Sequence, residues 1–180
     1  MEGIPSINTS SLNNRFCIAK SQTDTVCSRC YSNRYAKLRP SLENKLLQNT
    51  VLLSSRILSD HELPVINARY VRFSSFGELE NETHFINLVN TARRNTFTTF
   101  ALWTKRHEIV MKFPKEPNIK YIYSVSAIDG HCHSKKILEY FDKTFTAVSK
   151  GQQSNCHGAC FDCLLCYSTN NVKHIRELIK

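Results

Sequence analysis

The sequence predicts a single α/β domain in which about four mostly parallel strands, joined by crossover helices, form an open or half-barrel sheet. β-Branched and aromatic stretches alternate with amphipathic helical stretches, which is the pattern of parallel strands linked by right-handed crossovers. The 180 residues suit one domain, and a hydrophobic fraction of 41% with ten phenylalanines can fill its core.

Each element is expected from its local pattern. Strands follow from runs rich in β-branched and aromatic residues, at 65–73, 96–103, 119–125 and 144–148. Helices are expected where apolar residues recur at helical spacing, at 41–59, 85–92, 105–112, 134–140 and 172–179. Ser41 can cap the first helix, and Pro64 separates it from the first strand. The Ser- and Asn-rich residues 1–16 are expected to form a polar lead-in, so that the domain spans 17–180.

The eight cysteines are expected to be metal ligands. Four of them fall within the segment C-H-G-A-C-F-D-C-L-L-C, spaced by four, three and three residues. Such short spacings let consecutive thiolates converge on one centre, whereas disulfides are disfavoured in the cytosol, the compartment expected here. The candidate ligands are Cys17, Cys27, Cys30, Cys132, Cys156, Cys160, Cys163 and Cys166.

The spacing favours one or two 4Fe–4S clusters over zinc. Structural zinc sites commonly use two cysteine knuckles separated by about a dozen residues, whereas the C-terminal segment 156–167 packs four cysteines together, as in 4Fe–4S sites. Cys27 and Cys30 alone fit half of either site, so zinc stays open as the alternative metal. The neighbouring histidines are expected to be polar neighbours of the ligands; they are His131, His133 and His157.

The topology predicts where these cysteines lie. In α/β sheets the chemistry sits beyond the carboxyl ends of the strands, and Cys132 follows the third expected strand there. Cys27 and Cys30 precede the first helix and can fold back onto the same edge. We expect Cys17, Cys27, Cys30 and Cys132 to form one site and the run 156–166 to form the other, with all eight cysteines gathered at this edge of the sheet. An interleaved pairing is the alternative.

Composition limits the remaining function classes. The net charge of +9 would fall to about +5 if two four-thiolate centres were bound, whether they hold iron or zinc. No secretory signal or membrane-spanning run is recognisable, so a cytoplasmic location without membrane association is expected. Basic residues interleaved with tyrosines suit nucleic acid as a partner or a solvated basic surface. The oligomeric state is not indicated. The sequence lacks a phosphate-binding glycine loop, a G-x-S-x-G motif and an H-E-x-x-H motif.

Four motifs resemble the "gene product 88" family of phage- and plasmid-borne cysteine-rich proteins. They are V-C-S-R-C-Y, V-R-F-S-S-F-G-E-L, F-A-L-W-T-K-R and the closing C-x2-C-x2-C-Y, in this order across 17–167. The resemblance implies an α/β fold and a bound cluster, an origin in a phage or mobile element, and hence the cytoplasm of the host cell. It implies little about the reaction, because the family's molecular activity is poorly defined.

The arrangement is also distantly similar to radical S-adenosylmethionine enzymes. In that reading, Cys17, Cys27 and Cys30 hold a four-iron cluster with one open iron, and Phe76-Gly77-Glu78 contacts the cofactor, S-adenosylmethionine. The C-x3-C-x2-C spacing of those enzymes lies instead at Cys156, Cys160 and Cys163. A fourth thiolate, such as Cys132 or Cys166, would close the open iron and exclude the cofactor.

Two hypotheses from different classes follow. The chain is a cluster-dependent protein, either a minimal radical-enzyme relative or a redox protein, or it is a non-catalytic module stapled by clusters or zinc that binds nucleic acid or a host protein. Glu78 is the best candidate for a catalytic residue. The alternative explanation is that Glu78 and Glu80 begin the second helix, where the helix dipole favours carboxylates.

Overall fold

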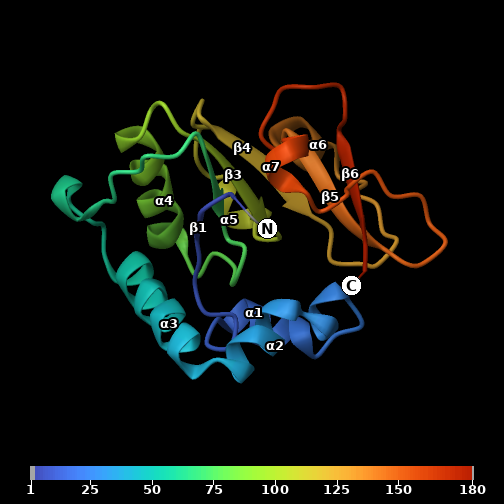
Figure 1. Cartoon of the computed structure of the whole chain (residues 1–180), viewed down its shortest axis with the longest axis horizontal. Coiled ribbons are helices and arrows are strands. Elements are labelled where there is room, and N and C mark those ends of the chain that lie inside the picture. The colour runs from blue at the N-terminus through green and yellow to red at the C-terminus, as the bar shows by residue number, and fades with distance from the viewer. Residues whose placement is uncertain (1–2, 180) are drawn as a thin grey trace.

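Six parallel strands form one open sheet in the computed structural model, which describes residues 3–179 (Figure 1). The order of the strands across the sheet follows their order along the chain, and every neighbouring pair is parallel. The crossover segments between the first five strands pack on one face of the sheet, and the segment between the last two strands packs on the other. The predicted α/β class is therefore confirmed, with six strands in the described part of the chain rather than four.

The elements have the following bounds. The strands are β1 (Ser6–Ile7), β2 (Tyr70–Phe73), β3 (Thr99–Thr104), β4 (Ile119–Ser124), β5 (Lys143–Val148) and β6 (His174–Leu178). The α-helices are α1 (Arg15–Ser21), α2 (Tyr31–Leu38), α3 (Pro40–Ser55), α4 (Glu82–Arg94), α5 (His107–Val110), α6 (Lys135–Tyr140) and α7 (Cys160–Cys163). Two 3-10 turns are η1 (Val26–Arg29) and η2 (Asp60–Glu62).

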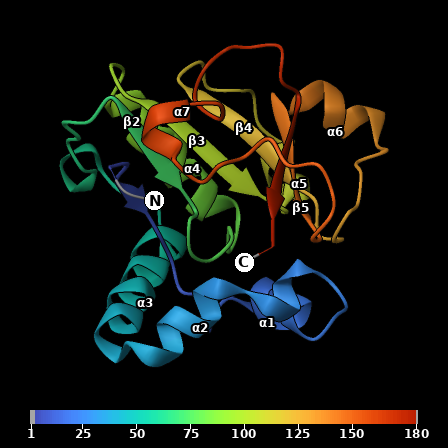
Figure 2. The same ribbon diagram turned by 45° about the vertical axis from the view of Figure 1, so that its right-hand side comes forward.

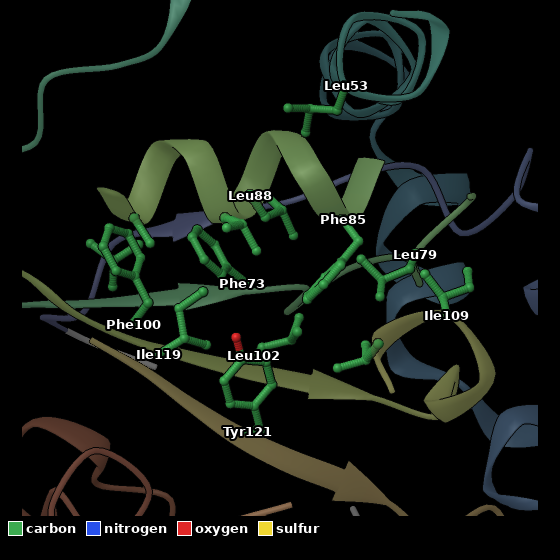
Figure 3. Packing of buried hydrophobic residues seen from close by; sticks show 14 of the residues in the cluster. Leu53, Phe73, Leu79, Phe85, Leu88, Phe100, Leu102, Ile109, Ile119 and Tyr121 are labelled. Carbon is green, nitrogen blue, oxygen red and sulfur yellow. The ribbon is translucent and has the colours of Figure 1, made fainter. Parts of the chain in front are cut away.

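Helix α4 covers one face of the sheet and forms the main core with it. The Asn81 side chain caps this helix by accepting the His84 N–H at 2.9 Å, and two arginines occupy its last turn. Figure 3 shows Phe85 and Leu88 of α4 facing the strand residues Phe73 and Tyr121. These apolar side chains are fully buried, so their burial is the main source of stability on this face.

The C-terminal segment covers the opposite face. Figure 2 shows α7 lying over β2 and β3, and Tyr167 packs there against Trp103, Ile122 and Ile4. Alternation along each strand sends successive side chains to opposite faces, so β3 contributes Phe100 to the main core and Trp103 to this second cluster. The sheet is therefore enclosed between helices and the cysteine-rich segment.

The helix expected at 172–179 is wrong. Residues 174–178 form β6, which pairs with β5 in parallel register from Thr144–His174 to Val148–Leu178. Val172, Ile175 and Ile179 recur at spacings of three and four, which imitates a helical face. As the edge strand, β6 needs few apolar residues, and Ile175 alone is fully buried.

The lead-in expected at 1–16 is also different, because its described residues belong to the domain. Ser6 and Ile7 pair with Arg72 and Phe73 as β1. The following polar segment is buried because its groups find partners: the Ser10 N–H donates to Thr50 Oγ1 at 2.9 Å. Polar residues can be buried when they are hydrogen-bonded, and composition alone does not reveal that pairing.

No helix within residues 3–179 is long and apolar enough to cross a membrane. The longest helix, α3, contains 16 residues and exposes polar side chains along much of its length.

Replacing Phe85 by alanine should lower the free energy of unfolding by about 3–5 kcal/mol, since a fully buried aromatic ring leaves a cavity. The matched control is Phe97→Ala, because the Phe97 side chain is 99% exposed and its loss should cost less than about 0.5 kcal/mol. Urea denaturation of both variants measures the difference. Equal losses would contradict the assignment of Phe85 to the core.

His84 should make stability depend on pH. It is buried on α4, and its Nδ1 accepts the Glu80 N–H at 3.2 Å; burial lowers the pKa of His84 to about 4, from 6.5. Above pH 6.5 His84 is neutral in both the folded and the unfolded chain, so its protonation takes nothing from the free energy of unfolding. As the pH falls toward 4, only the unfolded chain gains the proton, and about 3 kcal/mol is lost.

Urea denaturation of the wild type and of His84→Gln at pH 7 and at pH 4 tests this dependence. The wild type should lose about 3 kcal/mol more than the variant between the two values. A constant difference between the two proteins would show that His84 is not held neutral by burial.

Candidate functional site

Cys17, Cys27 and Cys30 come together in the structure, and we call them the N-terminal thiol group. Their thiols are close enough for Cys27 and Cys30 to act electrostatically on Cys17. Burial raises the pKa of Cys17 well above its usual range, and the neighbouring Glu78 raises it further. Burial also raises the pKa of Cys27. The thiols of Cys17 and Cys27 are therefore neutral at physiological pH unless a cation binds them.

Local hydrogen bonds set the positions of these cysteines. Asn14 caps α1, and its side chain accepts the Cys17 N–H at 3.0 Å. Thr25 caps η1, and its hydroxyl accepts the Cys27 N–H at 3.3 Å. The 3-10 turn then brings the Cys30 N–H to 3.2 Å from the Cys27 carbonyl oxygen. The C-x2-C motif is thus a capped turn.

The N-terminal thiol group is attached to the carboxyl edge of the sheet. Ser126 follows β4 in the chain, and its carbonyl oxygen accepts the Val26 N–H at 3.0 Å. Ser75 follows β2, and its carbonyl oxygen accepts the Tyr31 hydroxyl at 2.5 Å. Figure 1 shows α1 and α2 side by side along this end of the sheet. The segment containing Cys27 and Cys30 therefore folds back onto the strand ends.

Glu78 and Lys105 place opposite charges beside the N-terminal thiol group. Glu78 is only 8% exposed; its carboxylate accepts hydrogen bonds from the Thr104 hydroxyl at 2.7 Å and from the Lys105 N–H at 3.2 Å. Burial raises the pKa of Glu78, while the charge of Lys105 opposes that rise. The Lys105 ammonium donates to Ser124 Oγ at 3.0 Å, and its charge lowers the pKa of Cys17 and of Cys27 against the larger effect of burial.

The segment Phe76-Gly77-Glu78 is engaged with the protein itself. Phe76 packs edge-on against Tyr31 and Tyr35, with ring centroids 5.6 and 6.5 Å apart. Glu78 precedes α4 rather than beginning it, so its hydrogen bonds, and not the helix dipole, hold it. The segment thus links the thiol-bearing turn to β3, and its contact with S-adenosylmethionine stays a prediction.

A glycine is required at position 77 by the backbone conformation there and by the close approach of Thr9. Its φ of +70° lies in the left-handed region, and a Cβ there would collide with Thr9, whose carbonyl oxygen lies 2.6 Å away. The Thr9 N–H donates to the Phe76 carbonyl oxygen at 3.2 Å, which fixes this close approach. The glycine therefore permits protein packing.

Cys156, Cys160, Cys163 and Cys166 line one pocket, and we call them the C-terminal thiol group. Helix α7 carries Cys160 and Cys163 one turn apart, and Leu164 then adopts a left-handed conformation with φ of 47°. This reversal brings Cys166 back toward the others. Leu165 donates its N–H to Cys163 Sγ at 3.5 Å, a contact typical of thiolate ligands.

The C-terminal thiol group lies against the face of the sheet, which corrects the expectation that all eight cysteines gather at its edge. Cys160 and Cys166 pack on the cluster containing Trp103 and Tyr167. Burial raises the pKa of both thiols, that of Cys166 to about 12, and the positive charge of Arg72 opposes the shift. The reason is that β6 runs parallel to β5, so the segment that joins the two strands must return along the sheet. This segment, which contains the C-terminal thiol group, crosses the face of the sheet.

Cys132 lies between β4 and α6 and packs against the main core. Its thiol approaches the Ser134 carbonyl oxygen at 4.0 Å. The charges of Cys132 and Glu78 both act on Tyr123, so Cys132 is near the edge that holds the N-terminal thiol group. His131 and His133 flank it with ring centroids 6.4 Å apart.

The donor chemistry of both groups suits a four-iron cluster. Within residues 3–179, no three histidine, cysteine or acidic side chains converge closely enough to hold a single metal ion. A zinc ion gathers four sulfurs at about 2.3 Å, whereas each cysteine of a four-iron cluster binds a different iron, which spreads the thiolates. The fit rests on the all-thiol donor sets, the N–H donor to Cys163 and the cations beside each group.

Sequence reasoning did not single out two cations of the site. Lys105 follows β3 directly, at the carboxyl edge where site residues are expected, so its position was a usable signal. Lys143 is a buried lysine on β5 whose ammonium donates to Asn170 Oδ1 and to the Val172 carbonyl oxygen, both at 2.7 Å. Its role depends on the return of β6, which the sequence pattern concealed.

Gly77→Ala should lower the free energy of unfolding through both backbone strain and the collision with Thr9, about 2–5 kcal/mol together. Gly151→Ala is the matched control, because Gly151 also has a positive φ, +94°, but faces open space, so only about 1–2 kcal/mol should be lost. Urea denaturation compares them. If Gly77→Ala costs no more than the control, Thr9 does not constrain this loop.

The comparisons with known proteins leave the family open. No protein-family model matches the chain. No curated protein and no solved structure matches it either. The function must therefore be argued from the two thiol groups and the residues around them.

Proposed function

We propose that this chain is an iron–sulfur protein with two 4Fe–4S centres, one at the carboxyl edge of the sheet and one on its face. The observation that carries the proposal is the division of the cysteines into two groups, each supported by its own turns and each beside a cation of the sheet. The C-terminal thiol group supplies four ligands. The N-terminal thiol group supplies three, with Cys132 as the proposed fourth.

A bound cluster supplies one-electron chemistry at either position. The chain's own residues hold the thiols in place and balance their charge. Lys105 offsets the negative charge of the N-terminal thiolates, and Glu78 fixes the backbone of Lys105 relative to the strand end. If Cys132 is not a ligand, three thiols leave one iron open, which is the arrangement that a radical S-adenosylmethionine enzyme requires; if it is a ligand, the protein is a redox carrier.

A cytoplasmic location is proposed on chemical grounds. All eight cysteines are free thiols, and such thiols persist in reducing compartments. A phage or mobile-element origin and a nucleic-acid partner for the basic surface stay predictions from the sequence.

Anaerobically purified protein should be brown and contain about eight iron and eight sulfide per chain when both clusters are present. Removing Cys160 and Cys163 together should lose one cluster, and removing Cys27 and Cys30 together should lose the other. Zinc in place of iron and sulfide would replace the proposal with a zinc-stapled module. A protein that binds neither metal would refute a metal-binding role for the thiols.

Cys132→Ser tests the partition of the ligands. If Cys132 completes the N-terminal centre, the variant should lose iron from that centre, and a variant that loses none would overturn the assignment. Electron paramagnetic resonance of the reduced protein, with and without S-adenosylmethionine, then tests for an open iron. No spectral change on adding it would exclude cofactor binding at the cluster.

A further inference from the structure

Arg72 is a cation on the sheet face that carries the C-terminal thiol group. It lies in β2 between Val71 and Phe73, which are both buried in the main core. Because neighbours in a strand point to opposite faces, Arg72 points toward the second cluster. Its guanidinium lies over the ring of Trp103, 3.9 Å from the ring centroid. Strand and indole together fix the place of this charge.

The C-terminal thiol group packs against the same aromatic cluster. Trp103 and Tyr167 meet edge to face, with centroids 6.0 Å apart, and Cys160 and Cys166 pack against the cluster that they form. The charge of Arg72 acts on the sulfurs of both cysteines. Arg72 is therefore close to this thiol group and is half-buried on the face that carries it.

The other charges around the group are arranged differently. Lys143 interacts electrostatically with Cys166, but its ammonium also donates hydrogen bonds to Asn170 Oδ1 and to the Val172 carbonyl oxygen. Glu177 acts in the opposite sense on Cys156 and Cys160. Arg72 is distinguished by its position over the Trp103 ring and by its electrostatic effect on two of the cysteines, and replacing it leaves the hydrogen bonds of Lys143 to the loop in place.

We propose that the charge of Arg72, whose guanidinium lies over the Trp103 ring, raises the reduction potential of the C-terminal centre. The inference rests on the proposed function and names a determinant of that site. A centre with four thiolates becomes more negative when it takes up one electron from an external one-electron reductant, and no bond or proton needs to change. A fixed positive charge in a weakly polar environment stabilises the reduced form more than the oxidised form.

The test isolates the C-terminal centre in the full chain by replacing Cys17, Cys27 and Cys30 with alanine. Arg72→Gln and Arg72→Lys are then compared in this background by anaerobic redox titration, with iron and sulfide assayed in each variant. Arg72→Gln should shift the midpoint potential to more negative values. Arg72→Lys, which keeps the charge but loses the planar stacking, should shift it less.

Arg69→Gln is the matched control, because Arg69 precedes β2 and is exposed. Removing its charge should leave the potential unchanged, since solvent screens exposed charges. Equal shifts in Arg69→Gln and Arg72→Gln would assign the effect to net charge and overturn the inference. Equal shifts in Arg72→Gln and Arg72→Lys would show that the positive charge is not the cause.

The iron assay separates failure of the inference from failure of the proposed function. If the parent variant holds no iron, the proposed function fails and the inference falls with it. If the iron is present and Arg72→Gln leaves the potential unchanged, the inference alone fails. Loss of iron from both Arg72 variants would show that Arg72 is needed for assembly of the site and would also overturn its proposed role.

Discussion

Parallel pairing of consecutive strands is the constraint on which the rest of this structure depends. The crossovers from β1 to β5 place α3, α4, α5 and α6 in the main core on one face of the sheet, whereas the β5–β6 crossover carries α7 over the other face. The carboxyl ends of β2, β3 and β4 consequently lie along one edge, where Glu78, Lys105 and Ser126 meet the N-terminal thiol group. The opposite face is covered only by this last crossover, within the described residues, and the C-terminal thiol group lies there.

The central part of this fold could be predicted from the sequence because its signals are local. Strands β2 to β5 and helix α4 show the apolar periodicity that burial on one or both faces requires. The edge strands could not be predicted in this way. β1 has two residues, and β6 has one fully buried side chain, so their strand character comes from pairing with a neighbour that is distant in sequence.

The same distinction between local and distant signals decides which features of the candidate site could be predicted. The grouping of Cys156 to Cys166 follows from spacing, and the turn at Cys27 and Cys30 follows from the C-x2-C motif. The contacts of Gly77 with Thr9 and of Glu78 with Thr104 depend on chain segments that no short motif connects. That is why F-G-E suggests a cofactor contact in the sequence but forms protein contacts in the structure.

The burial of the thiols limits what they can do. Desolvation raises the pKa of Cys17, Cys27, Cys156, Cys160 and Cys166, so none of these is an activated nucleophile of the kind found in thiol-dependent enzymes. A metal reverses this balance, because a coordinating thiol loses its proton to the cation.

The nearby cations favour the same outcome. Lys105 and Arg72 each lower the pKa of thiols in one group without outweighing burial, so they assist ionisation but do not cause it. In both groups the protein thus holds thiols of raised pKa beside fixed positive charge. This arrangement has little value for nucleophilic catalysis, and it becomes useful when a metal centre supplies the remaining charge.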